Sequence, residues 1–73
     1  MYYYVTYETY GDGNFLHVVE DSIEAYDLDE ARGAAEARAE ELECEEAEEY
    51  ADDFDTISVN LSTIYDENGI RVA

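Results

Sequence analysis

Carboxylate side chains dominate one segment of the sequence, EELECEEAEEYADDFD, which runs from Glu40 to Asp55. Ten of its sixteen residues are acidic and none is basic. If the segment is helical, a rise of about 1.5 Å per residue places these charges about 2.4 Å apart along the axis. Duplex DNA carries one charge about every 1.7 Å. An ordered row of carboxylates at this density can therefore stand in for a phosphate backbone.

The same acidic segment has two other interpretations. It can be the solvated face of an ordinary helix, whose charge has no function. It can also reflect adaptation to high salt, because salt-loving proteomes use many acids and few lysines, and this chain has no lysine. A domain that unfolds below molar salt would favour adaptation, whereas stability at ordinary ionic strength would favour a functional charge.

The overall charge narrows the class of partner. Twenty-one acids stand against three arginines, which gives a net charge of −18 at pH 7. A field of this sign repels nucleic acid and anionic membranes and attracts basic protein surfaces. No transmembrane segment or signal peptide is evident either. We therefore expect a cytoplasmic protein that binds neither nucleic acid nor membrane directly and whose partner is basic.

Catalytic and metal-binding patterns are lacking. Paired carboxylates act as acid and base only in a pocket that separates their pKa values, and so short a chain offers little pocket. The DENG segment (66–69) lacks EF-hand spacing. His17 is the only histidine, and Cys44 lies between two glutamates that disfavour its thiolate. The sequence predicts no enzyme, no metal site and no cofactor.

Tyrosine is the second abundant side chain, and it is concentrated at the start of the chain. MYYYVTYETY alternates with period two, as in a strand of aromatic and β-branched residues. Tyr3 and Tyr7 lie on one face, and Tyr2, Tyr4 and Tyr10 lie on the other. One helix covers only one face of a sheet, so one set is open. An open set is a contact surface for a partner or a second copy, or packs across strands to shield the sheet.

Turn and cap residues divide the rest of the chain into elements. GDGN (11–14) predicts a hairpin turn, after which FLHVVE (15–20) forms the returning strand. Asp27, with Glu30 three residues later, predicts the N-terminal cap of a helix that runs from Leu28 to about Tyr50. An apolar stripe lies on one side of this helix and consists of Leu28, Ala31, Ala35, Ala39 and Leu42. Beyond Leu42 the stripe reaches Glu46 and Glu49, so we expect the last turns to project past the sheet or fray.

The C-terminal third predicts a second hairpin. DTISVNLSTIY alternates as a half-buried strand, with Ile57, Val59, Leu61, Thr63 and Tyr65 on one face. Asn-Gly in the following turn favours a hairpin, and IRVA (70–73) is predicted to be a short edge strand. The predicted fold is α+β, as a single domain over residues 1–73. It has the order β-β-α-β-β, with a four-stranded, mainly antiparallel sheet and one long acidic helix packed on one face.

A resemblance to a known class rests on size, charge, element order and the segment AAEARAEELECEEAEEYADDFD. The chain resembles small acidic phage-encoded proteins that mimic DNA, among them several anti-CRISPR proteins. The resemblance implies an inhibitor that blocks the DNA channel of a Cascade-type complex, of a Cas nuclease or of a similar DNA-binding protein, in the cytoplasm of a host bacterium.

A second resemblance is to HicB-like antitoxin domains, in which a hairpin precedes a helix opened by an acidic stretch. The matching segment here is DLDEARGAA (27–35). The resemblance implies an antitoxin-like interaction module. Together with the salt-adapted module that the lack of lysine suggests, this is the alternative function: a module that dimerises through its tyrosine face or binds a basic partner.

These observations define a set of candidate partner-binding residues. We expect the protein to be a monomer rather than a homodimer. The predicted phosphate surrogates are Glu36, Glu40, Glu41, Glu45, Glu48, Glu49, Asp52 and Asp53, and the candidate aromatic anchors are Tyr2, Tyr4 and Tyr10. The expected partner is a basic nucleic-acid-binding protein such as a Cas effector subunit.

Overall fold

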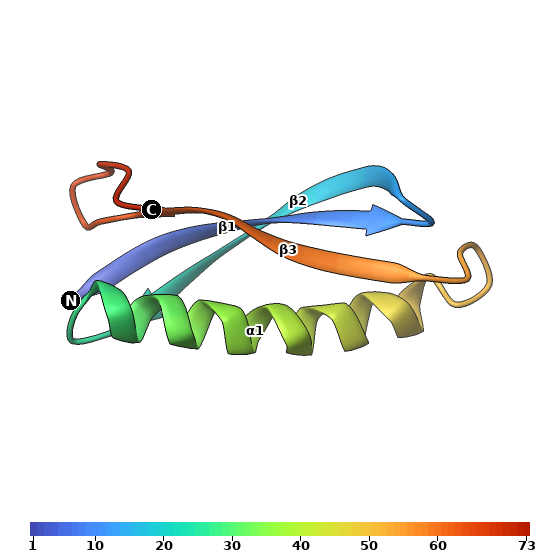
Figure 1. Ribbon diagram of the computed structural model, residues 1–73, viewed down its shortest axis with the longest axis horizontal. Helices are drawn as coiled ribbons and strands as arrows, with labels where there is room; N and C mark the ends of the chain where they lie inside the picture. The colour runs from blue at the N-terminus through green and yellow to red at the C-terminus, as the bar shows by residue number, and fades with distance from the viewer.

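The fold is α+β, with one helix and a three-stranded antiparallel sheet. A computed structural model describes residues 1–73 as β1 (Tyr2–Gly11), β2 (Asn14–Glu24), α1 (Leu28–Glu49) and β3 (Ile57–Tyr65). The sheet order is β2-β1-β3, so β1 lies in the centre and hydrogen-bonds to both neighbours. Figure 1 shows α1 running along one side of the twisted strands, with no layer on the other side.

The predicted fourth strand is wrong. After the Asn-Gly turn the chain folds back beside β3, but Arg71 makes only an isolated bridge with Tyr65. Two successive amides, those of Val72 and Ala73, both donate to the carbonyl of Ile64, so the alternating ladder of a strand is not formed. The element order is therefore β-β-α-β.

The start of α1 forms as its cap residues predict. The backbone of Asp27 is extended, and its side chain accepts a hydrogen bond from the Glu30 amide at 2.9 Å. This bond satisfies one of the amides that the first turn leaves free. Asp29 and Glu30 add negative charge at the positive end of the helix dipole.

The alanine stripe of α1 packs on the sheet. Ala31, Ala35 and Ala39 are buried together with Leu42, and they meet Tyr3, Val5 and Tyr7 of β1 in a single apolar cluster of ten buried residues. Because alanine extends only one carbon from the backbone, the helix can lie close to the strands. The core is consequently thin, and its largest buried side chain is Tyr7.

The alternation of β3 reverses partway along the strand. Thr6 pairs with Thr63 whereas Tyr7 pairs with Leu61, so Ser62 is an extra residue in β3. Such a bulge moves all later side chains to the opposite face. The prediction that Thr63 and Tyr65 share a face with the buried Val59 is therefore wrong. Ile64 is buried in their place, with 1% of its surface exposed, and Tyr65 lies on the open face.

One aspartate in the first turn holds the far end of the sheet together. Asp12 adopts a positive φ of 51° in the tight turn between β1 and β2. Its carboxylate accepts hydrogen bonds from the amides of Asp55 and Thr56, which precede β3. These bonds, with that to Thr56 first, lower the pKa of Asp12. The turn therefore fixes the chain that leaves α1 to the start of β3.

The last turns of α1 neither fray nor project past the sheet, which corrects a third expectation (Figure 1). The helix continues to Glu49, and Glu46 is 9% exposed against the sheet. Past the helix, the ring of Phe54 lies against Gly11, where an added Cβ would come within 2.7 Å of it. Beyond Leu42, where the apolar stripe stops in the sequence, contact with the sheet is thus continued by Glu46 and then by Phe54.

Enlarging the alanine stripe should destabilise the fold. Ala35→Leu adds three carbons to a side chain with no exposed surface, so we expect the free energy of unfolding to fall by about 1–3 kcal/mol. Ala37→Leu is the matched control, because Ala37 is exposed on the same helix. Urea unfolding followed by circular dichroism at one salt concentration measures both. Equal losses in the two variants would contradict close packing of this stripe.

Candidate acidic helix and tyrosine face

The predicted phosphate surrogates are exposed along α1 and just beyond it. A helix of this length spans about 33 Å at the usual rise. Successive residues lie about 100° apart around a helix axis, so the acids form two rows on either side of the face opposite the sheet. Glu36 and Glu40 lie in one row, and Glu41, Glu45 and Glu48 lie in the other. All eight surrogates are exposed, and they are Glu36, Glu40, Glu41, Glu45, Glu48, Glu49, Asp52 and Asp53.

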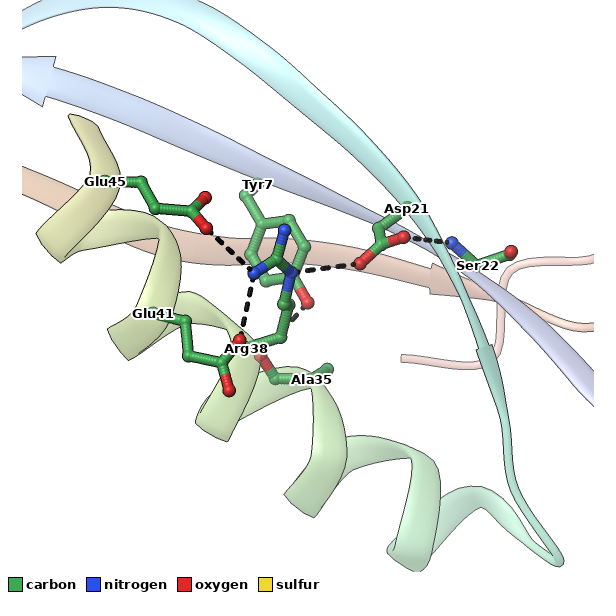
Figure 2. A network of polar contacts seen from close by, with 7 residues as sticks. All are labelled: Tyr7, Asp21, Ser22, Ala35, Arg38, Glu41 and Glu45. Atoms are coloured by element: carbon green, nitrogen blue, oxygen red, sulfur yellow. Dashed lines mark hydrogen bonds and ion pairs between the residues drawn. The ribbon is translucent and has the colours of Figure 1, made fainter. Parts of the chain in front are cut away.

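One base lies among these acids and is fully engaged. Figure 2 shows Arg38 between the helix and β2. Its guanidinium lies 2.9 Å from Glu41, 3.6 Å from Glu45 and 3.4 Å from Asp21 of β2. The hydrogen bond with Glu41 is the largest of the effects that raise the pKa of Arg38. Glu41 and Glu45 therefore have part of their charge offset, whereas Glu36, Glu40, Glu48 and Glu49 do not take part in any ion pair.

Tyr7, which lies next to Arg38 (Figure 2), attaches the acidic helix to the central strand β1. Its hydroxyl donates to the carbonyl oxygen of Ala35 at 3.0 Å (Figure 2). Burial, followed by the nearby charge of Asp21, raises the pKa of Tyr7 to about 12. A buried hydroxyl that kept no partner would destabilise the fold, so this bond fixes the helix at one height along the strand.

Glu46 is the acid of the run that the structure turns inward, and the sequence did not reveal it. Its Oε1 lies 3.1 Å from Nε2 of His17 in β2. Its other oxygen is buried without a hydrogen-bond partner, as is the hydroxyl of Thr9, the residue that pairs with His17 across the strands. Spacing was the signal that could have placed Glu46, because it continues the alanine stripe at i+7 from Ala39. This acid is not available to an external partner.

Asp52 and Asp53 lie in the turn after α1 rather than on the helix. The amides of Asp53 and Phe54 both donate to the carbonyl of Tyr50, which forms a tight turn. The ring of Tyr50 packs edge-on against Phe54, with ring centres 5.9 Å apart. The two exposed carboxylates therefore extend the acidic surface past the helix end on an anchored segment.

Burial shows which tyrosines of β1 face the helix and which lie on the uncovered face of the sheet. Tyr3 and Tyr7 face the helix, whereas Tyr2 and Tyr4 on the uncovered face are 52% and 50% exposed. Tyr10 is half-buried, because its ring packs edge-on against Phe15 and its hydroxyl donates to Glu8. That hydrogen bond raises the pKa of Tyr10, and the charge of Glu24 raises the pKa of Tyr2.

The two parts of the predicted site are thus on opposite sides of the sheet. The acids of α1 and the anchors Tyr2, Tyr4 and Tyr10 are separated by the strands, so one flat partner surface cannot contact both. The uncovered face also carries Phe15 and Val18, both at least half exposed, which sequence reasoning missed. Their position follows from the hairpin register, in which Phe15 pairs with Tyr10 and Val18 with Glu8.

Other kinds of site find little support. No group of three or more potential ligands is arranged to hold a metal ion. The only helix, α1, lacks an apolar stretch that could cross a membrane. Neither the family models nor the curated proteins nor the solved structures include a match to this chain.

Arg38 should stabilise the fold more than Arg32, the other arginine of α1. We expect Arg38→Gln to lower the free energy of unfolding by about 1 kcal/mol at low salt, because it removes three charge contacts, and by less as salt screens the remaining acids. Arg32→Gln changes the net charge equally, but Arg32 is exposed and takes part in no ion pair. Urea unfolding at two salt concentrations measures the difference, and identical behaviour of the two variants would refute the bridging role.

Tyr7 should ionise well above the ordinary range for a tyrosine. Because its pKa in the folded state is raised from 10.0 to about 12, Tyr7 contributes stability that is complete below pH 10 and is lost as pH rises toward 12. In an absorbance titration at the phenolate band, Tyr7→Phe should remove the component near pH 12 and leave the earlier ones. Loss of a component near pH 10 instead would show that the Tyr7 hydroxyl is not held against α1.

Proposed function

We propose that this protein inhibits a nucleic-acid-binding protein by presenting α1 in place of DNA. The observation that carries the proposal is the pair of exposed carboxylate rows on an ordered helix, which is fixed to its sheet by Tyr7, Arg38 and the alanine stripe. The molecule is 39 Å in its longest dimension, so its net charge of −18 corresponds to about one charge per 2.2 Å. This density approaches that of duplex DNA, at about one per 1.7 Å.

The partner that this surface fits is a basic groove that normally holds a phosphate backbone. A Cascade-type complex or another Cas effector in the cytoplasm of a host bacterium has such a groove, and the protein would act there as an anti-CRISPR-like inhibitor and not as an enzyme. Binding of this kind is steered by long-range attraction, so association is fast and weakens with salt. The acids without an ion pair supply most of this attraction.

A competition experiment tests the proposal. A labelled target duplex is bound to a purified Cascade-type complex, and the protein is added in increasing amounts while bound duplex is followed by mobility shift. We expect displacement of the duplex, with lower potency at higher salt. Glu36→Gln, Glu40→Gln, Glu48→Gln and Glu49→Gln in one variant should lower potency at least tenfold, since they remove four unpaired carboxylates and leave the Arg38 bridge intact.

The control variant replaces the same four glutamates with aspartate, which keeps the charge and retracts each carboxylate by one carbon. It should retain most of the potency. Circular dichroism at ordinary ionic strength must show that wild type and both variants are folded; a wild-type chain that unfolds below molar salt would support salt adaptation instead. Simultaneous binding of duplex and protein, or full potency of the glutamine variant, would overturn the proposal.

A further inference from the structure

A shallow hollow of about 530 Å³ lies on the uncovered face of the sheet, away from α1. On that face it is lined by Tyr4, Tyr65, Glu20, Thr6 and Ser22, and the adjacent strand residues Val5 and Asp21 also contribute to its lining. The side chains of Tyr4, Glu20 and Ser22 are exposed. Two tyrosines, a glutamate and two small hydroxyl residues therefore line the same hollow.

Strand pairing explains why the hollow forms there. Tyr4 pairs with Ser22 on one side and with Tyr65 on the other, so these three side chains form one row across the sheet. Thr6 lies in the next row and pairs with Glu20 and Thr63. Residues in adjacent rows of one face stand about 7 Å apart, and the small side chains leave the space between the large ones empty. The bulge at Ser62 is required, because it brings Tyr65 to this face.

Neither Tyr4 nor Tyr65 packs its ring against another aromatic ring of the chain. The aromatic pairs in the structure join Tyr10 to Phe15 and Tyr50 to its neighbours, and none includes Tyr4 or Tyr65. The chain's own Arg71 pairs with Tyr65 across the C-terminal bridge, but its Nε donates to the carbonyl of Ala73. The hollow thus has free aromatic surface and an unpaired carboxylate.

We propose that this hollow binds an arginine side chain of a partner protein. A guanidinium is planar, stacks on tyrosine rings and donates two parallel hydrogen bonds to a carboxylate such as that of Glu20. Lysine fits less well, because its ammonium is strongly hydrated and cannot stack. The net charge of −18 attracts a cation and repels an anion at this site. The inference does not require α1 to act as a DNA substitute, because the hollow lies across the sheet from it.

Two labelled peptides of equal length and charge test the assignment, one with four arginines and one with four lysines spaced by glycine and serine. Binding to the 73-residue chain is followed by fluorescence anisotropy at physiological salt. We expect the arginine peptide to bind about three- to tenfold more tightly, the range for one or two exposed cation–π contacts. In nuclear magnetic resonance spectra it should shift the amides of Tyr4, Ser22 and Tyr65.

Matched variants decide which residues are responsible. Glu20→Gln, and separately Tyr65→Leu, should abolish the preference for arginine. Glu24→Gln and Tyr26→Leu should keep it, because they change the same residue types at exposed positions outside the hollow. The helix variant with four glutamines should weaken both peptides equally, which separates this proposal from the one above. Equal affinity for the two peptides, or a preference that survives Glu20→Gln, would overturn it.

Discussion

Repulsion between carboxylates is the constraint with which every element of this structure must be compatible. Twenty-one acids are held in a molecule 39 Å long by a core of ten buried residues, of which four are alanines. So thin a core contributes modest apolar burial, and short chains have little to spare. The chain meets the constraint by spreading the charge. The helix carries acids on two separated rows. Its single paired arginine joins two of them and Asp21 of β2 to one cation, and the innermost acid is turned toward a histidine.

This arrangement gives the two faces of the molecule different chemistry. The helix side carries the exposed carboxylate rows. The sheet side mixes tyrosine, phenylalanine and valine with isolated glutamates, as is typical of surfaces that contact proteins. Because the sheet separates them, a partner can contact one side while the other remains free. The same geometry allows two basic segments of one partner to hold the chain from both sides.

The local elements were predictable where short-range rules operate. The first hairpin, the cap at Asp27, the helix from Leu28 and the alanine stripe all follow from spacing and turn chemistry. Three features depended on tertiary context that spacing alone does not contain. The C-terminal residues had too few partners to complete a ladder, and the bulge at Ser62 reversed the alternation of β3. Spacing placed Glu46 on the stripe, but it did not reveal that His17 of another element would meet its carboxylate there. The acids of the candidate site were found from composition, but their separation from Tyr2, Tyr4 and Tyr10 required knowledge of which face the helix covers.

The bulge in β3 also bears on how much change the outer surface can absorb. Ser62 is the one residue of this region without a partner in β1, whereas Leu61, Thr63 and Tyr65 keep partners on either side of it. A strand without Ser62 would run through the same pairs in regular alternation, and Tyr65 would stay on the open face. The bulge therefore lets β3 carry one residue more than its neighbour while the position of each later side chain is preserved.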